Sequence, residues 1–551
     1  MLLQQPLHLP IGGFWHNSRH LSYSTIRRCF RSDSFVRAGV FLSTFYIQQF
    51  GCRATQADGA AIERQLLDRG FTPASDPSAA AVVIVNTCTV TSAADSQARA
   101  AIRKIHAQNP AARVIVTGCY AQRAPEELAA LPGVTWVVGN SHKPQIPHLI
   151  ESISPQLIAS PTEQLLSPVN SNFVSATNRD FVPATTLARV DNGPHSVAGA
   201  GLAPLDSTRL ATILTGNIFD RSDFLSAPIL GGEGNHTRPI LKIQDGCNSR
   251  CSYCVIPFVR GKSRSLPPET VLQEIQRLSD SGFREIVLSG INLGAYGRDL
   301  SPRVEFEDLL RRILDETHVQ RLRISSIEPL DVTQDLIDLF AGSGRIAQHF
   351  HMPLQSASDR ILAAMHRWYR AEHYARRVEL IHERLPHAAI GADVITGFPG
   401  ETEADHAATL SFIERLPFTY LHVFSFSKRP GTQAANFSSE VPAPIIKRRA
   451  SELRARGEQK AAAFRSTQLG RTLRVLTLRG DDTDTYSPSG NPGGYSPPRT
   501  TPALSTNYLR VRIPGSFPAN SFLDVLISGE EGNSLVAEPA AALSESSASL
   551  R

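Results

Sequence analysis

The chain has 551 residues, 41% of them hydrophobic, a length too great for one ordinary domain and typical of about three or four modules. Its 56 Lys and Arg against 51 Asp and Glu give a net charge of +5, which is compatible with an RNA partner but does not require one. No apolar run approaches the ~18 residues of a transmembrane helix, and the clustering of three of the seven cysteines argues against a secreted disulfide framework. We therefore expect a cytoplasmic, monomeric protein without a membrane segment, whose cysteines bind metal.

Residues 1–43 contain five arginines and one acidic residue, Asp33, a composition that mimics an organellar transit peptide. No periodic pattern begins before Phe45, so we expect a disordered extension or a start placed upstream of the true one. From there strand and helix patterns alternate, which favours a doubly wound α/β domain over residues 44–150. Its expected strands lie at 44–50, 81–86 and 113–117. One expected helix follows the first strand and has Ala61, Ile62, Leu66 and Leu67 on one face, and a second helix is expected over 93–107.

Residues 151–235 are rich in Ser, Thr, Pro, Asn and Gly, so we expect an inserted linker in which short apolar pieces such as 211–214 pack locally. Six strand patterns separated by helical segments follow and predict a partial (β/α)6 barrel over 236–465. In such a barrel the chemistry lies at the C-terminal ends of the strands. The six strands are expected at 240–244, 285–289, 321–326, 349–354, 390–396 and 421–426.

Beyond a basic helical stretch at 446–465, the pattern changes to short alternating strands. This change predicts a small β domain over residues 466–540, followed by a tail at 541–551. The segment 480–505 is rich in Thr, Ser, Pro and Gly and is expected to be a disordered loop. The strands of this domain are expected at 471–478, 508–513 and 522–527.

Three cysteines in a Cys-x3-Cys-x2-Cys spacing, Cys247, Cys251 and Cys254, directly follow the first expected barrel strand. Three thiolates on one tight loop can each bind one iron of a [4Fe–4S] cluster and leave the fourth iron without a protein ligand. That iron can chelate the amino and carboxylate groups of S-adenosylmethionine (SAM), and the reduced cluster can pass an electron into the sulfonium bond. A structural zinc site would instead need a fourth ligand, and the nearest candidate, His236, precedes the strand. We expect these cysteines to be catalytic.

Three further cysteines, Cys52, Cys88 and Cys119, each follow an expected strand of the first domain. The carboxyl ends of the strands in a doubly wound sheet line one crevice, so these residues can converge and ligate a second [4Fe–4S] cluster. The alternative is three separate buried thiols, because free cysteine packs well as a small hydrophobic residue. Cys29 follows no strand and is expected to be incidental.

The first cysteine spacing resembles that of the radical SAM superfamily, and the segment 257–265 after it narrows the resemblance to the methylthiotransferases. The resemblance covers about residues 44–150 and 236–540, and one departure is Arg53, where the family more usually has Lys. The amino-acid sequences of four segments resemble those of the methylthiotransferase branch that acts on N6-threonylcarbamoyladenosine at position 37 of tRNA. These segments are 86–91, 118–122, 325–329 and 424–432.

The resemblance implies an α/β protein with an N-terminal doubly wound domain, a central partial (β/α)6 radical SAM barrel and a C-terminal small β-barrel similar to the TRAM domain. It also implies that one SAM yields a 5′-deoxyadenosyl radical that abstracts the C2 hydrogen, that sulfur arrives at the second cluster, and that a second SAM supplies the methyl group. The implied partners are tRNA and an electron donor such as flavodoxin or ferredoxin, while the sulfur donor is not readable. The alternatives are isopentenyladenosine-37 or a ribosomal-protein aspartate as acceptor, or a non-enzymatic iron–sulfur RNA-binding protein.

Residues at or just past the barrel strand ends are candidates for the SAM pocket, because glycines there let a ligand approach the backbone and polar side chains can bind it. The alternative for the glycines is an ordinary turn. These candidates are Gly290, Asn292, Ser326, Glu328, Gln355 and Gly397. Arg260, Lys262 and Arg264 beside the cysteine loop are candidates for contact with RNA phosphate or the SAM carboxylate. Residues of the β domain are candidates for contact with RNA, and the alternative for both groups is a solvated surface. The β-domain candidates are Arg471, Arg474, Arg479, Tyr508, Arg510 and Arg512.

Overall fold

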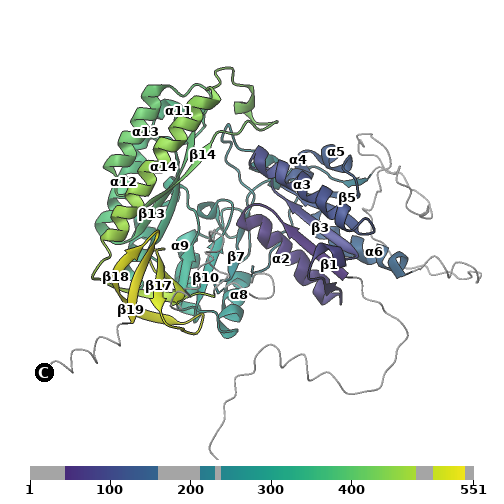
Figure 1. Ribbon diagram of the computed structural model, residues 1–551, viewed down its shortest axis with the longest axis horizontal. Helices are drawn as coiled ribbons and strands as arrows, with labels where there is room; N and C mark the ends of the chain where they lie inside the picture. Colours follow the sequence, from purple (N-terminus) through teal and green to yellow (C-terminus); the bar gives the residue numbers. More distant parts are fainter. Residues whose placement is uncertain (1–43, 159–210, 230–236, 480–499, 540–551) are drawn as a thin grey trace, which may run out of the picture. The chain divides into compact units, whose positions relative to one another are not determined.

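The computed structural model of the protein describes residues 44–158, 211–229, 237–479 and 500–539, which all belong to one unit, Ser43–Arg551 (Figure 1). The expectations for residues 1–43, for Cys29, for His236 and for the tail therefore fall outside the described residues. None of the helices in these ranges is long and apolar enough to cross a membrane.

A six-stranded parallel sheet in the order β2-β1-β3-β4-β5-β6 forms the N-terminal domain. Helices α2 and α6 pack against one face and α3, α4 and α5 against the other, so the domain is doubly wound, as predicted. The strands are β1 (Thr44–Gln49), β2 (Thr72–Pro73), β3 (Val82–Thr87), β4 (Arg113–Gly118), β5 (Val134–Gly139) and β6 (Thr212–Leu214). The helices are α2 (Arg53–Asp68), α3 (Ser92–Gln108), α4 (Cys119–Arg123), α5 (Pro125–Ala129) and α6 (Ile146–Ile158).

Several features of this domain differ from the sequence expectation, which had three strands and lacked β2, β5 and β6. Strand β6 lies within the range expected to be a linker, and it pairs in parallel with β5 because its apolar residue Leu214 joins the core beneath α6. Helix α6 also continues past residue 150, so the linker expected over 151–235 contains ordered structure at both ends. Leu67, expected on the buried face of α2, is 46% exposed, because the core contacts of this helix come from Ala61, Ile62 and Leu66.

The six expected strands of the central domain are all present as two three-stranded parallel sheets, β11-β10-β7 and β12-β13-β14. Isolated bridges from Leu322 to Ile346 and from Ser326 to His351 join the two sheets into one arc. The strands are β7 (Ile240–Lys242), β10 (Glu285–Ser289), β11 (Arg321–Ile324), β12 (His349–Gln355), β13 (Ala389–Thr396) and β14 (Tyr420–Ser425). The covering helices include α8 (Pro268–Asp280), α9 (Phe306–Glu316), α10 (Gln334–Gly342), α12 (Ala371–Arg384) and α13 (Glu403–Arg415).

Side chains along these strands alternate between two faces. One face is apolar and packs against the helices in a single core, with members such as Leu241, Leu288, Ile324, Met352 and Ala392. The other face turns away from the helices and carries many polar side chains; we call it the lumen. The polar lumen side chains include Lys242, Gln244, Glu285, Arg321, Arg323, His349, His351, Asp393, Tyr420 and His422.

Helix α14 (Ala443–Ser466) packs along β14 and leads into a closed C-terminal barrel in the order β15-β16-β17-β19-β18 (Figure 1). Its strands are β15 (Thr472–Thr477), β16 (Thr500–Ser505), β17 (Arg510–Pro514), β18 (Phe522–Glu531) and β19 (Ser534–Pro539). Residues 500–505 therefore belong to a strand and not to the disordered loop expected over 480–505. They are ordered because β16 pairs on both sides and buries Ala503 and Leu504. Residues 480–499 fall outside the described residues.

Candidate functional site

The cysteines of the N-terminal domain lie at the carboxyl ends of three adjacent parallel strands. Cys52 stands between β1 and α2, Cys88 follows β3, and Cys119 is the first residue of α4 after β4. The first two loops are in close contact, because a Cβ added to Gly51, whose φ is +96°, would stand 2.3 Å from the Cys88 Cβ. The sheet therefore brings the three predicted cysteines to one edge, as their strand positions indicate.

These three thiols are also close enough to affect the pKa of Cys88. Burial raises the pKa of Cys88 to about 12, and the neighbouring sulfurs of Cys119 and Cys52 contribute to the rise. A buried thiol with so high a pKa stays protonated unless a cation compensates the thiolate, and a metal is such a cation. The Asn140 amide donates to the Cys119 sulfur at 3.5 Å and to the Val259 carbonyl at 2.7 Å. This donor set fits an iron–sulfur cluster.

The second set, Cys247, Cys251 and Cys254, lies on the loop between β8 (Gln244–Asp245) and α7 (Ile256–Arg260). Burial raises the pKa of Cys254 to about 12, with the sulfurs of the other two adding to the rise. The loop is anchored by Ser252, whose backbone N–H donates to the Met365 carbonyl at 3.0 Å. These thiols likewise fit a metal cluster whose positive charge replaces their protons.

Arg367, which the sequence analysis did not single out, links this loop to a predicted SAM residue. Its guanidinium donates to the Cys251 sulfur at 3.5 Å and forms an ion pair with Glu328. Burial raises the pKa of Cys251, and the positive charge of Arg367 counteracts that rise. A cation at this position stabilises the thiolate form that a metal requires.

Helix α7 connects the two sets of cysteines. It begins two residues after Cys254, and its residue Val259, together with Val255 just before it, packs against Cys119 at the start of α4. The two sets therefore lie on either side of one short helix, although they are more than 120 residues apart in sequence between Cys119 and Cys247. The sequence predicted each set separately but not this contact.

A buried ionic network fixes the N-terminal domain to the barrel. The carboxylates of Asp58 and Asp245 face the cations of Lys143, Lys242 and Arg260, and none of these side chains is more than 2% exposed. Arg260 bridges the two carboxylates, at 3.0 Å from Asp58 and 2.7 Å from Asp245. Burial alone would raise the pKa of Asp58, but the surrounding cations, Arg260 first, hold it well below its usual range.

This network corrects the expectation for two of the three basic residues beside the cysteine loop. Arg260 and Arg264 are buried and engaged with Asp245, so they are not available to RNA or to SAM. The Asp245 carboxylate lies within 4 Å of both guanidinium groups and so offsets part of the cost of their desolvation. Lys262 is exposed, so its side chain remains a candidate for phosphate contact.

A second ion pair joins the N-terminal domain to the other edge of the barrel. Arg429, shortly after β14, donates to the Thr89 hydroxyl at 2.8 Å and forms an ion pair with Asp95 of α3. Lys242 of β7 binds Asp58 at the opposite edge of the six-stranded arc. The N-terminal domain therefore contacts the barrel at β7 and just after β14, which are the two edge strands of the arc.

The predicted SAM residues divide into two groups. Asn292 and Gln355 each have a buried side-chain oxygen without a hydrogen-bond partner among the described residues, and Glu328 reaches Cys251 through Arg367. Ser326 forms a bridge with His351 of β12. Gly290 and Gly397 have packing explanations: an added Cβ would stand 2.9 Å from Leu293 in the first case and 2.4 Å from Ile446 in the second, where φ is +78°.

Two family models match the chain, the Radical SAM superfamily over residues 241–413 and Uncharacterized protein family UPF0004 over residues 44–139. The threonylcarbamoyladenosine tRNA methylthiotransferase of Aquifex aeolicus is 33% identical over 432 residues, which cover 78% of this chain and 92% of that protein. The chain belongs to the radical SAM methylthiotransferases. As a radical SAM protein it uses a [4Fe–4S] cluster and SAM.

Other methylthiotransferases are similar to a comparable degree. The threonylcarbamoyladenosine tRNA methylthiotransferase of Bacillus subtilis is 32% identical, covering 79% of this chain and 85% of that protein. The tRNA-2-methylthio-N(6)-dimethylallyladenosine synthase of Syntrophobacter fumaroxidans is 33% identical, covering 74% and 79%. Among solved structures, the radical SAM methyltransferase TsrM of Kitasatospora setae has a TM-score of 0.48 at 16% identity, covering 71% and 77%. The overall sequence identity of these relatives to the chain therefore does not show which of the two adenosine derivatives is its substrate.

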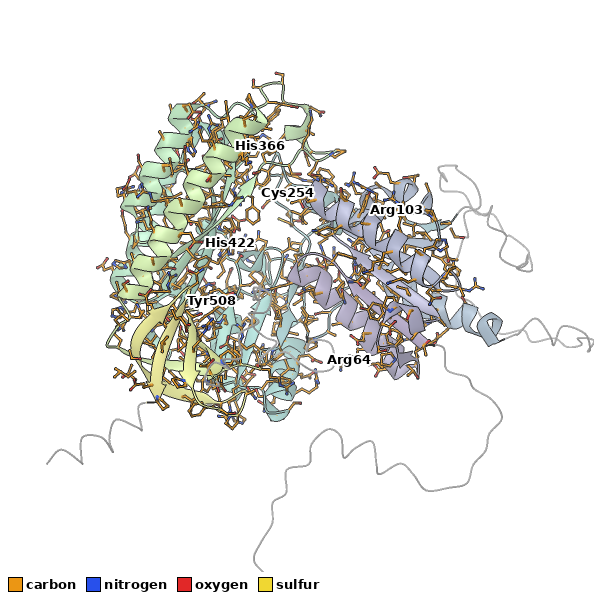
Figure 2. The ribbon with its side chains drawn as sticks, viewed as in Figure 1. Arg64, Arg103, Cys254, His366, His422 and Tyr508 are labelled. Carbon is orange, nitrogen blue, oxygen red and sulfur yellow. The ribbon has the colours of Figure 1, made fainter. Side chains whose placement is uncertain are left out.

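The C-terminal barrel of this methylthiotransferase places its predicted RNA-contacting residues in two settings. Arg474, Arg479, Arg510 and Arg512 are exposed, and Arg471 is half-buried. Tyr508 lies where the C-terminal barrel meets the central domain (Figure 2). Its ring stacks on His349 of β12 with the ring centroids 4.4 Å apart, so one face of the ring is covered. The backbone carbonyls of residues 504–506 also accept hydrogen bonds from two lumen arginines, Arg321 and Arg323. Tyr508 therefore anchors the domain and is not a free stacking platform for bases.

The lumen holds a polar cluster that the sequence analysis missed. Its members are His349 and His351 of β12, Asp393 of β13, and Tyr420 and His422 of β14. A signal was present, because two histidines at alternate positions of an otherwise apolar strand share the face opposite the core. The two-residue alternation of β12 predicts that His349 and His351 share one face of the strand, but it does not predict that this face lines the lumen.

Proposed function

We propose that this methylthiotransferase acts on tRNA and replaces the C2 hydrogen of N6-threonylcarbamoyladenosine at position 37 by a methylthio group. The observation that carries the proposal is the pairing of two cysteine sets on either side of α7, one on the barrel and one on the N-terminal domain. One cysteine set suffices to cleave SAM, whereas a second one offers a place for sulfur. Two relatives that are 33% and 32% identical bear the name of this activity.

Cys247, Cys251 and Cys254 would hold a [4Fe–4S] cluster, which when bound supplies the electron that cleaves SAM. Arg367 orients and neutralises the Cys251 thiolate and positions the Glu328 carboxylate beside it. Glu328 suits the ribose hydroxyls or the amine of SAM, both of which donate hydrogen bonds. The oxygens of Asn292 and Gln355 that lack a partner among the described residues suit further donors of the same ligand.

Cys52, Cys88 and Cys119 would hold a second [4Fe–4S] cluster, which when bound offers the place where the sulfur that enters the product is delivered. Asn140 donates to the Cys119 sulfur at 3.5 Å and would orient this ligand. The Thr55 hydroxyl lies 3.6 Å from the Cys52 sulfur and accepts from Arg260 at 3.3 Å. The ionic network therefore fixes the loop of Cys52 relative to the barrel.

The proposed partners follow from the relatives and from the charge distribution. Exposed arginines on the C-terminal barrel and Lys262 suit a tRNA backbone. We further propose that the enzyme is cytoplasmic and monomeric, consumes two SAM molecules per turnover and receives electrons from a donor of the flavodoxin or ferredoxin type. Its functional domains would span about 44–150, 236–465 and 466–540. The competing acceptor is N6-dimethylallyladenosine, which the name of the Syntrophobacter fumaroxidans relative carries.

Mass spectrometry of tRNA nucleosides tests the acceptor. Cells that lack the gene should lose 2-methylthio-N6-threonylcarbamoyladenosine, and the intact gene should restore it while the Cys251→Ala variant should not. If this nucleoside persists in the deletion strain, or if only the dimethylallyl derivative disappears, the proposed acceptor is wrong.

A further inference from the structure

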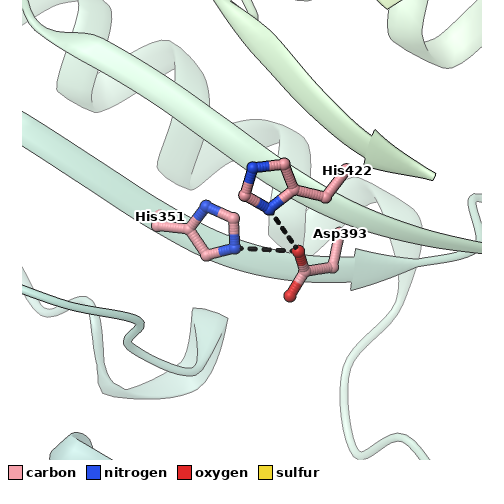
Figure 3. A group of neighbouring side chains, drawn as sticks. All are labelled: His351, Asp393 and His422. Atoms are coloured by element: carbon pink, nitrogen blue, oxygen red, sulfur yellow. Dashed lines mark hydrogen bonds and ion pairs between the residues drawn. The ribbon is translucent and has the colours of Figure 1, made fainter. Parts of the chain in front are cut away.

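Two histidines from the strands on either side of β13 converge on one carboxylate oxygen of this strand (Figure 3). Asp393 Oδ1 lies 3.0 Å from His351 Nε2 and 3.2 Å from His422 Nδ1. Asp393 and His422 are direct partners in the register of β13 and β14, so the strand pairing itself holds them together. We call His351, Asp393 and His422 the lumen triad.

A second layer of residues fixes the orientation of the triad. The Tyr420 hydroxyl lies 2.9 Å from His351 Nδ1 and 2.8 Å from His349 Nε2. The Tyr420 ring lies over Gly391, where an added Cβ would stand 2.0 Å from a ring carbon, so this position admits no side chain. Ordered side chains in the lumen of an enzyme barrel suit the binding of a substrate.

The hydrogen bonds within the triad leave two of its acceptor atoms available to a ligand. Burial would raise the pKa of Asp393, but hydrogen bonds from His351 and His422 hold it well below its usual range, so the carboxylate is ionised and accepts from both rings. Asp393 Oδ2 and His422 Nε2 then remain as acceptors that no residue of the described ranges contacts. The His422 side chain is 54% exposed, so its outer nitrogen is accessible. The triad therefore suits a ligand that donates N–H or O–H groups.

The N-terminal domain lies against the same barrel. Helix α2 begins at Arg53, directly after Cys52, and its residue Asp58 forms an ion pair with the lumen residue Lys242 of β7. The element that follows the first cysteine of the N-terminal set therefore contacts the lumen side of the barrel.

We propose that the lumen triad binds the N6 substituent of the acceptor adenosine and selects a threonylcarbamoyl group over a dimethylallyl group. This inference rests on the proposed function. A threonylcarbamoyl group offers N–H and hydroxyl donors for Asp393 and His422. A dimethylallyl group offers none of these and would leave the carboxylate and the imidazole without partners, which penalises its binding.

The test compares two tRNAs that differ only at the N6 substituent, with the holoenzyme reconstituted anaerobically. Wild-type protein should methylthiolate threonylcarbamoyl tRNA far better than dimethylallyl tRNA. His422→Phe and Asp393→Asn should each reduce kcat/KM for threonylcarbamoyl tRNA by about 10- to 100-fold, mainly through KM, as expected for a lost hydrogen bond to a charged group. His422→Phe should also raise the activity on dimethylallyl tRNA relative to the wild type, because an apolar ring replaces the unpaired acceptor.

Controls separate recognition from folding and from the proposed function. Iron content and 5′-deoxyadenosine formation without tRNA should be unchanged in the triad variants, and His373→Phe, at an exposed position of α12, should behave as wild type. If His422→Phe and Asp393→Asn keep kcat/KM within about twofold of the wild type, this inference is wrong while the acceptor stands. If wild-type protein modifies only dimethylallyl tRNA, both the acceptor and this inference are wrong.

Discussion

Removal of the Asp58 carboxylate tests whether the buried ionic network holds the two parts of the site together. In the Asp58→Ala variant, Lys143, Lys242 and Arg260 would lose a shared counterion in a region where no side chain of the network is more than 2% exposed. Only Asp245 would remain to balance these cations. A buried ion pair that loses one partner destabilises a protein by about 3–5 kcal/mol, because the remaining charge stays desolvated.

We therefore expect Asp58→Ala to lower the apparent melting temperature of the holoenzyme by several degrees. It should also reduce the iron content, because Asp58 lies on α2, the helix that begins directly after Cys52. Asp68→Ala, at the exposed end of the same helix, is the matched control and should change stability by less than about 0.5 kcal/mol. Differential scanning calorimetry and iron analysis measure both effects. A loss below about 1 kcal/mol with full iron content would refute the role of the network.

Three further predictions concern the cysteine loop, the lumen and acid stability. Arg367→Ala should reduce 5′-deoxyadenosine formation by about 10- to 100-fold, because Glu328 loses its partner; unchanged formation, measured by chromatography, would contradict this role. Gly391→Ala should destabilise the protein by about 1–3 kcal/mol in urea unfolding, because its Cβ meets the Tyr420 ring, and an unaltered midpoint would exclude the clash. Stability should fall as pH drops below about 6.5, because the pKa of buried His349 is lowered and only the unfolded chain takes up the proton. It should fall further below about pH 4, where unfolded carboxylates protonate while the pKa of Asp58 stays low. Greater stability at about pH 5 than at about pH 7 would contradict the first sign, and greater stability at about pH 3 than at about pH 5 would contradict the second.

The sequence predicted the parts of the structure that leave a periodic signal. All six barrel strands were expected because each is a short apolar pattern between helices, and the cysteines were recognised by their position after strands. Strand β6 was not expected, because three residues carry too little periodicity and its pairing partner lies beyond a long insert. Strands β16 and β19 were missed for a similar reason, since Pro residues and polar neighbours obscure their alternation.

The contacts that assemble the site could not be predicted from local patterns. Asp58 contacts Lys242 and Arg260 at sequence separations of 184 and 202 residues, and nothing near Asp58 in sequence indicates a buried carboxylate. Arg260 was expected to contact RNA or SAM because basic residues beside a cluster loop usually suggest an anion. Its burial depends on a partner in another domain. Such pairs become visible only when the domains are packed together.

The most direct test of the central claim is the product that purified protein makes from threonylcarbamoyl tRNA, SAM and a reductant after reconstitution with iron and sulfide. The account predicts about eight irons per chain and a product with a methylthio group at C2. It also predicts that Cys88→Ala still cleaves SAM to 5′-deoxyadenosine but inserts no sulfur. Formation of the methylthio product by Cys88→Ala would contradict the account, because sulfur would then enter without the second cysteine set.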